Sequence, residues 1–189
     1  MTTIRRVASA IRRATFPPLL LGQIAELLAR AYVIASGGGR LTTFKPDADV
    51  DHKDVIVDTR GGDQHAYLQV KCAARLYQDQ VWCSARYLIG QIPSSGRLLY
   101  LFAFLDLHSV ELTQMWLVPA PEFNRLAYRK RVGRYVELWF KTPRRDHRWD
   151  RFAIGRDQLA ARIIALMEAA PAEKAIIAPA ESLGIRLAA

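Results

Sequence analysis

The sequence has few of the residues that mark secreted, zinc-binding or membrane-spanning proteins. Only two cysteines are present, Cys72 and Cys83, which are too few for the disulfide framework of a secreted domain. The four histidines are scattered and show no Cys/His spacing of the zinc type. No uninterrupted run of about eighteen apolar residues occurs, so the sequence alone predicts no membrane span. The cytoplasm is therefore the expected compartment.

Acidic residues are scarce relative to basic ones. The chain has 27 lysines and arginines against 18 aspartates and glutamates, a net charge of +9, and no acidic residue precedes Glu26. This balance favours a polyanionic partner, most commonly nucleic acid, although acidic membrane surfaces attract the same charge. Two common catalytic motifs are also missing. The glycines at 37–39 lack the Lys-Ser/Thr of a phosphate loop, and no serine stands in a nucleophile elbow.

The length and the apolar pattern predict one α/β domain. We expect a basic N-terminal segment at 1–17, a single domain at 18–169 and an Ala/Pro-rich tail at 170–189. Residues 98–105 (LLYLFAFL) are apolar throughout, which is typical of a strand covered on both faces. The other expected elements are helices at 18–35, 85–92, 121–128 and 157–169, and strands at 41–44, 54–58, 66–72, 111–118, 135–141 and 151–154, the last two as a pair.

A two-glycine turn joins two of these strands into a predicted hairpin. A turn centred between Gly61 and Gly62 places Asp54 opposite Gln69 on one face of the sheet, with Cβ atoms about 5 Å apart. Side chains alternate along a strand, so Lys71 shares this face with Gln69. A carboxylate, an amide oxygen and an ammonium then meet at one point, as a hydrated divalent cation beside a phosphate would require.

The hairpin carries a short motif that is known from nucleases. An aspartate that opens one strand and the Gln-Val-Lys sequence at 69–71 on the next resemble the signature of the PD-(D/E)XK nuclease superfamily. The form with glutamine in place of the acid is similar to a branch that includes group I intron endonucleases and small uncharacterised bacterial members. In that superfamily a helix before the hairpin often carries a metal-binding glutamate, and Glu26 stands at this place. The resemblance covers residues 18–169 and implies a restriction-endonuclease-like core, in which helices flank a mixed central sheet.

The resemblance implies a metal-dependent DNA endonuclease or related phosphodiesterase that uses Mg²⁺, with Mn²⁺ able to substitute. The implied metal ligands are Asp54, Asp51, Gln69 and Glu26, and either aspartate can be the principal one. The implied catalytic set is Asp54, Gln69, Lys71 and Glu26. In this set Lys71 positions the attacking water or helps to deprotonate it. Many relatives act as dimers, so a homodimer is a further expectation.

The residues of the implied metal site also permit simpler interpretations. Lys71 and Asp54 could form a cross-strand salt bridge on a surface hairpin, which would contribute a fraction of a kcal/mol. Glu26 and Arg30 have the spacing of an i,i+4 ion pair. The neutral Gln69 lowers the negative charge of a metal site, as in a nuclease fold that binds nucleic acid without cleaving it. A third reading is a structural protein whose basic surface meets an acidic partner.

Basic and aromatic residues are interleaved between residues 125 and 151. Basic side chains neutralise phosphates and aromatic rings stack on exposed bases, so this composition favours a nucleic-acid-binding surface. The expected phosphate contacts are Arg129, Lys130, Arg131, Arg134, Lys141, Arg144, Arg145 and Arg148. The alternative is a solvated basic surface whose aromatic residues serve the core. Trp139 and Phe140 are adjacent in a predicted strand, so one of the two must point inward.

Overall fold

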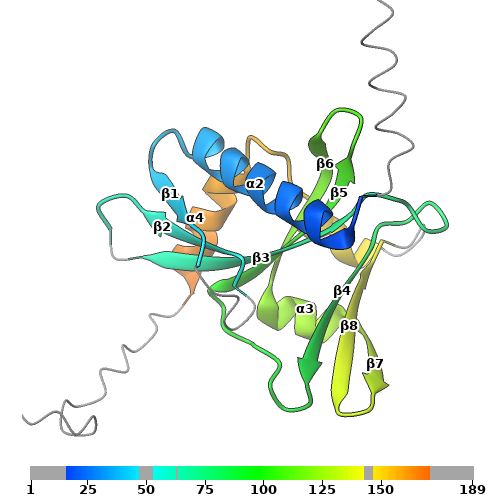
Figure 1. The fold of residues 1–189 in the computed structure, drawn as a ribbon. Helices are drawn as coiled ribbons and strands as arrows, with labels where there is room; N and C mark the ends of the chain where they lie inside the picture. Colours follow the sequence, from blue (N-terminus) through cyan, green and yellow to red (C-terminus); the bar gives the residue numbers. More distant parts are fainter. Residues whose placement is uncertain (1–15, 47–52, 63, 143–146, 171–189) are drawn as a thin grey trace, which may run out of the picture.

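The computed structural model describes residues 16–46, 53–62, 64–142 and 147–170. The helices are α2 (Pro18–Gly37), α3 (Ala120–Leu126) and α4 (Leu159–Ala169), with a short 3₁₀ helix, η1 (His147–Phe152). The strands are β1 (Leu41–Phe44), β2 (Val55–Thr59), β3 (His65–Ala73), β4 (Trp82–Leu88), β5 (Leu98–Asp106), β6 (Glu111–Pro119), β7 (Tyr128–Val132) and β8 (Tyr135–Lys141). Figure 1 shows how these elements are arranged.

The strands form a five-stranded mixed sheet and a smaller antiparallel sheet. The larger sheet has the order β1-β2-β3-β5-β6, in which β3 and β5 are parallel and the other neighbours are antiparallel. The smaller sheet has the order β4-β8-β7. A parallel pair needs a crossover, and the chain between β3 and β5 forms β4 on its way (Figure 1). The architecture is α/β with a mixed central sheet, as the resemblance implies.

Apolar side chains cover both faces of the five-stranded sheet. On one face, α2 and α4 enclose a core that includes Leu68 and Ile163. On the other face, β4, β8, α3 and η1 contribute to a second core that includes Phe102 and Phe140. β5 supplies residues to both cores, because its side chains alternate between the two faces. The apolar run 98–105 is therefore a strand covered on both sides, as predicted.

The β2–β3 hairpin has the predicted register. Val55 lies opposite Leu68 in the first pair of the two strands, so the predicted pairing of Asp54 with Gln69 falls just beyond the paired residues. The Asp54 backbone N–H donates at 2.9 Å to the carbonyl of Leu68, the partner of Val55, so the ladder departs from its regular pattern at Asp54. On β3, Leu68 and Val70 face α2, and Gln69 lies between them on the opposite face. The predicted register is therefore confirmed from Val55 to Asp58, and Gln69 lies on the face of β3 that points away from α2.

α2 begins at a proline and ends at a left-handed glycine. Pro18 stands in the first turn, where its missing N–H is tolerated, and Gly38 follows the helix with φ +56°. By length and composition this helix could cross a membrane, which the sequence analysis does not predict. Core helices of soluble proteins and N-terminal signal sequences meet the same criterion. In this structure Ala25, Ala29 and Val33 are fully buried, and the helix packs on α4 and the sheet.

The prediction of a helix at 85–92 is wrong, because residues 85–88 belong to β4 and a turn follows them. Burial along β4 alternates, so that Cys83, Ala85 and Tyr87 face the core and the residues between them are exposed. Alanine, arginine and leucine favour helices locally. Pairing with β8 along the whole length of β4 overrides that preference.

The strand pair predicted at 135–141 and 151–154 is also wrong. β8 occupies the first of these segments, but it pairs with β4 on one side and β7 on the other. Residues 147–152 form η1, and Ala153 makes a single bridge with Trp116 of β6. β7 is not predicted at all, because α3 ends at Leu126 and the chain then turns into an extended strand.

The C-terminal helix agrees with the sequence in its inward face. α4 begins at Leu159, and Leu159, Ile163 and Met167 are buried as predicted. Ile164 is only partly buried at the edge of the same core. The basic segment 1–17 and the tail 170–189 fall almost wholly outside the described residues, so the division of the chain stays a prediction.

Substitutions of two glycines test how α2 is formed and where it ends. Gly22 lies inside the helix and an added Cβ meets nothing within 4 Å, so Gly22→Ala should stabilise the protein by about 0.5–1 kcal/mol. Gly38 has equally open surroundings but a left-handed backbone, so Gly38→Ala should destabilise it by about 1 kcal/mol. Urea unfolding measures both changes. Shifts of the same sign in the two variants would contradict the role of Gly38 as the helix terminator.

Candidate active site

The Asp54 side chain continues the hydrogen-bonding of the β2–β3 pair where β2 begins. β2 starts at Val55, and beyond it the Val70 N–H of β3 donates to Asp54 Oδ2 at 2.7 Å. A carboxylate is a stronger acceptor for such a bond than a neutral carbonyl. The Asp54 N–H bonds to the Leu68 carbonyl at the same time. Backbone and side chain together hold a half-buried carboxylate at the end of the strand pair.

Gln69 precedes Val70, whose N–H binds Asp54, and is almost completely buried, with 2% of its surface exposed. A buried amide needs hydrogen-bond partners. Tyr87 of β4 is one, because its hydroxyl donates to Gln69 Oε1 at 2.8 Å. The Tyr87 hydroxyl also forms a short hydrogen bond with the Tyr100 hydroxyl of β5. This buried chain of three polar groups holds the Gln69 amide in one orientation.

Burial keeps both tyrosine hydroxyls protonated. Burial is the main reason that the pKa of Tyr87 is raised to about 12. The hydrogen bond from Tyr100 partly offsets this increase, and the charge of Asp54 adds to it. Burial also raises the pKa of Tyr100 far above its ordinary value. Each hydroxyl therefore carries its proton near neutral pH. Since the Tyr87 proton is directed to Gln69, the proton between the two tyrosines belongs to Tyr100.

Lys71 lies on the same face of β3 as Gln69, two residues further along. Its side chain is half-buried, and its ammonium makes no hydrogen bond or ion pair with any residue that the structure describes. The cross-strand salt bridge with Asp54 is therefore not formed. An ammonium in this position is available to a phosphate or to water.

Glu26 of α2 forms an ion pair with Lys45, which follows β1. The Lys45 ammonium lies 2.8 Å from Glu26 Oε2, and the Glu26 side chain is 18% exposed. The i,i+4 pair with Arg30 is not formed, because the Arg30 guanidinium donates to Thr43 Oγ1 at 3.3 Å. Both polar residues of α2 thus bind to the β1 segment instead of to each other.

Two carboxylates from different elements act on the Lys45 ammonium. The hydrogen bond and the charge of Glu26 raise the pKa of Lys45, and the charge of Asp54 raises it further. Glu26 and Asp54 therefore create a negative potential at one point, although one comes from a helix and the other from the start of a strand. The Lys45 ammonium lies at the point where Glu26 and Asp54 both attract a cation.

The donor atoms suit a hard divalent cation. Two carboxylates, of Asp54 and Glu26, and the Gln69 amide oxygen are ligands that Mg²⁺ and Mn²⁺ accept together with water. Asp51 lies outside the described residues, so its place in this set stays a prediction. Within the described ranges, no three His, Cys, Asp or Glu side chains form a metal-binding group by themselves. A metal here would depend on Gln69, on water and on substrate oxygens as well.

The predicted phosphate contacts gather on the smaller sheet and the segment after it. The described members are Arg129, Lys130 and Arg131 on β7, Arg134 in the following turn, Lys141 at the end of β8 and Arg148 on η1. All of these except Lys141 are exposed, and so is every residue of β7. Arg144 and Arg145 lie outside the described residues.

The sequence analysis does not identify Tyr87, Tyr100 or Lys45 as part of the site. The wrongly predicted helix at 85–92 conceals Tyr87, and the apolar run around Tyr100 suggests a plain core residue. A signal exists for both tyrosines, because a tyrosine in a buried strand needs a partner for its hydroxyl. No local pattern marks Lys45, since its partner Glu26 comes from another element.

No protein-family model and no curated protein matches the sequence. A comparison with solved structures finds two matches. One is a bacterial homing endonuclease, I-Ssp6803I, with 16% sequence identity and a TM-score of 0.55 over 82% of this chain and 100% of that chain. The other is Hjc, a Holliday junction resolvase from the archaeal hyperthermophile Archaeoglobus fulgidus, with 9% identity and a TM-score of 0.37 over 69% of this chain and 95% of that chain.

The similarity to the homing endonuclease shows the fold class of this chain. The match extends over the whole of that structure, and both have a mixed central sheet with flanking helices. This chain therefore has a restriction-endonuclease-like fold, as the sequence resemblance implies.

Tyr87→Phe tests the buried polar chain. The variant leaves the Gln69 amide oxygen without its donor, so we expect a loss of about 1–3 kcal/mol in the free energy of unfolding. The pKa of Tyr87 is raised from 10.0 to about 12, so its contribution to stability is complete below pH 10 and is lost as the pH rises through 12. Wild-type stability should therefore fall more steeply than that of the variant in this pH window.

Urea unfolding from neutral to alkaline pH measures both effects. Tyr135→Phe is the matched control, because the Tyr135 hydroxyl is on the outer face of the smaller sheet, beside Arg134. We expect this control to change stability by less than about 0.5 kcal/mol. Equal behaviour of the two variants would show that the hydroxyl of Tyr87 does not support Gln69.

Proposed function

We propose that this chain is a metal-dependent nuclease that hydrolyses phosphodiester bonds in DNA. The observation that carries the proposal is the end of the β2–β3 pair, where the Val70 N–H binds the Asp54 carboxylate and where Gln69 and Lys71, on either side of Val70, share one face of β3. These side chains have the order and spacing of the nuclease signature that the sequence resembles. The fold, which is shared with a homing endonuclease, supports the assignment.

Each residue has a chemical task under this proposal. Asp54 anchors the metal from a position that the strand pair fixes. Gln69, Glu26 and Asp51 are the other proposed ligands. Mg²⁺, or Mn²⁺ in its place, supplies a Lewis acid that polarises the phosphate and favours deprotonation of water. Lys71 orients the attacking water against the phosphate and offsets negative charge as it develops.

The basic β7–β8 hairpin supports nucleic acid as the substrate. Its exposed cations are suited to phosphate contacts, which give affinity without reading sequence. DNA in preference to RNA, a homodimer and residence in the cytoplasm belong to the proposal on the strength of the resemblance and of composition.

Nucleic-acid binding without cleavage is the second candidate function. It is favoured by Gln69, whose neutral amide oxygen already accepts a hydrogen bond from Tyr87. An acid at this position would add negative charge and strengthen binding of a divalent cation. The two functions differ in whether the Asp54 end of the hairpin takes up a metal and turns over substrate.

Cleavage assays with matched variants test the nuclease proposal. The purified protein with Mg²⁺ or Mn²⁺ should cut members of a panel of linear and branched DNAs. Asp54→Asn and Lys71→Ala should each lower the rate by about a hundredfold or more. Asp58→Asn is the control, because Asp58 lies on the same strand but opposite His65, and it should change the rate by less than about twofold.

Three results would count against the assigned site. Cleavage that survives Lys71→Ala would remove Lys71 from the reaction. Equal losses in Asp54→Asn and Asp58→Asn would indicate a general effect on the hairpin. Salt-sensitive DNA binding with neither metal uptake nor cleavage would support the binding module instead.

The Glu26–Lys45 ion pair allows a separate test of Glu26 as a metal ligand. A metal bound to Glu26 has to displace the Lys45 ammonium, so Lys45→Met should tighten Mn²⁺ binding by up to about fivefold, as expected for loss of an exposed ion pair. Glu26→Gln should weaken the binding. Titration calorimetry measures both, with Lys130→Met on β7 as the control for charge. Unchanged affinity in both variants would leave Glu26 as a structural partner of Lys45.

A further inference from the structure

The outer face of the β4–β8–β7 sheet carries aromatic rings that take no part in either core. Trp82 of β4 and Trp139 of β8 lie on this face, whereas Phe140 points into the second core. Tyr128 of β7 is opposite Trp139 and is 60% exposed. Tyr77, from the loop before β4, is 55% exposed and packs on Trp82 with ring centroids 4.5 Å apart. Clustered exposed rings of this kind mark binding surfaces.

A lysine ammonium lies among these rings. Lys141 Nζ is 3.8 Å from the ring centroid of Trp82, 5.0 Å from that of Tyr128 and 5.3 Å from that of Trp139. The faces of aromatic rings attract cations electrostatically, so these contacts fix the position of the charge. The cluster therefore combines flat π surfaces with a held cation.

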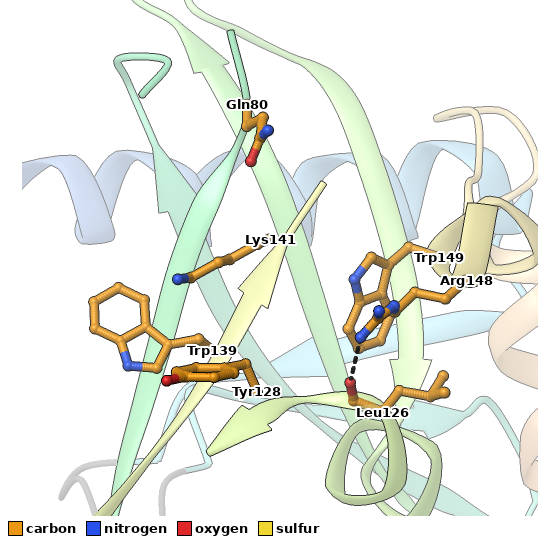
Figure 2. A pocket seen from close by; sticks show the side chains of 7 residues that line it. All are labelled: Gln80, Leu126, Tyr128, Trp139, Lys141, Arg148 and Trp149. Atoms are coloured by element: carbon orange, nitrogen blue, oxygen red, sulfur yellow. Dashed lines mark hydrogen bonds between the residues drawn. The ribbon is translucent and has the colours of Figure 1, made fainter. Parts of the chain in front are cut away.

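A pocket of about 200 Å³ opens beside this cluster. Figure 2 shows Tyr128, Trp139 and Lys141 on one side of it, and Arg148 and Trp149 on the other. Trp149 is buried within the second core, so the side of the pocket that Trp149 forms is held in place by packing. The size suits one planar ring system and is too small for a base pair.

The rim of the pocket offers hydrogen-bond donors and positive charge. Gln80 Oε1 accepts a hydrogen bond from the Trp82 indole N–H at 3.0 Å, which leaves the amide N–H groups of Gln80 without a partner among the described residues. The Arg148 guanidinium is held by the Leu126 carbonyl at 3.4 Å (Figure 2). The described residues that line the pocket include no acid. An electron-rich, anionic ligand therefore fits this site.

We propose that this pocket binds one unpaired nucleobase, stacked on Trp139 and Tyr128, with the adjoining phosphate held by Lys141 and Arg148. The inference rests on the proposed nucleic-acid function and adds the site where an unpaired base is held. Bases inside a duplex present only their edges to a protein. A ring can stack on a base only when that base has left the helix or belongs to a single strand.

The base pocket is separate from the candidate active site. Tyr87 and Trp82 belong to the same strand, but Tyr87 points to the inner face of the smaller sheet and bonds Gln69. Trp82 lies on the outer side, and the pocket is lined by residues of that side together with Leu126 and Trp149, but not by Tyr87, Gln69 or Asp54. Substitution of an outer ring therefore leaves the Asp54–Gln69 pair unchanged, and base binding can be measured independently of cleavage.

DNA binding in EDTA tests the pocket without the metal site. Fluorescence anisotropy compares an intact duplex, the same duplex with one bulged base, and the single strand. Trp139→Ala and Tyr128→Ala should each weaken binding of the bulged duplex and the single strand by roughly fivefold to a hundredfold, the range for loss of one stacked base. Binding of the intact duplex should change by less than about twofold. Tyr135→Ala, another outer ring of β8 outside the pocket, should leave all three affinities unchanged.

The outcomes separate the two sources of an unpaired base. Weaker binding of both the bulged duplex and the single strand supports a pocket that accepts bases extruded from a duplex as well as bases of single strands. Weaker binding of the single strand alone supports a pocket that accepts only bases of single strands. Unchanged affinities in both variants, an equal loss with the intact duplex, or an equal loss in Tyr135→Ala would overturn the pocket. Circular dichroism confirms folding, and the exposed Tyr128 provides a second variant if Trp139→Ala does not fold.

The same measurements distinguish this inference from the proposed function. If the wild-type protein binds none of the three DNAs, the nucleic-acid function and the base pocket are both wrong. If it cleaves DNA with Mg²⁺ but Trp139→Ala and Tyr128→Ala bind every DNA normally, only the pocket is wrong. Asp54→Asn should retain the preference for unpaired bases, because Asp54 does not line the pocket.

Discussion

The candidate site depends on the register of a single strand pair. β2 and β3 meet in one register, and at the end of this pair the Val70 N–H binds the Asp54 carboxylate. A slip of one residue would turn every side chain of β3 to the other face and place Lys71 beneath α2. Apolar cores cover both faces of the sheet, so such a slip would put polar groups into apolar surroundings. Packing of the core and assembly of the site are thus specified together.

Burial gives the site one rigid neutral group among several charged ones. Gln69 projects into the second core, where the hydroxyls of Tyr87 and Tyr100 form its polar surroundings. A satisfied buried network has little freedom to reorganise, so the amide presents one geometry to any ligand. Asp54 and Lys71 are half-buried at the margin of the sheet, where water and substrate can reach them. The neutral residue fixes the geometry, and its neighbours provide the charge.

Local signals predict the hairpin, whereas distant pairing decides the smaller sheet. Two turn glycines and strand alternation are short-range patterns, and they suffice to predict the register of β2 on β3. β4 owes its conformation to β8, which pairs Ser84 with Trp139 far along the chain. No local pattern encodes such a partner, so the composition of this segment predicts a helix that the sheet overrides. The Glu26 ion pair is likewise decided by how α2 lies over β1.

β7 is an edge of the smaller sheet, and its outer backbone groups are open to another strand. Arg129, Lys130 and Arg131 oppose such pairing, because two edges of like charge repel each other. The cations proposed to contact phosphates would therefore also oppose aggregation of the free protein through this edge. A polyanion that neutralises these cations removes the repulsion at the moment of binding. Under the proposed function, the tendency of this edge to pair would therefore depend on whether nucleic acid is bound.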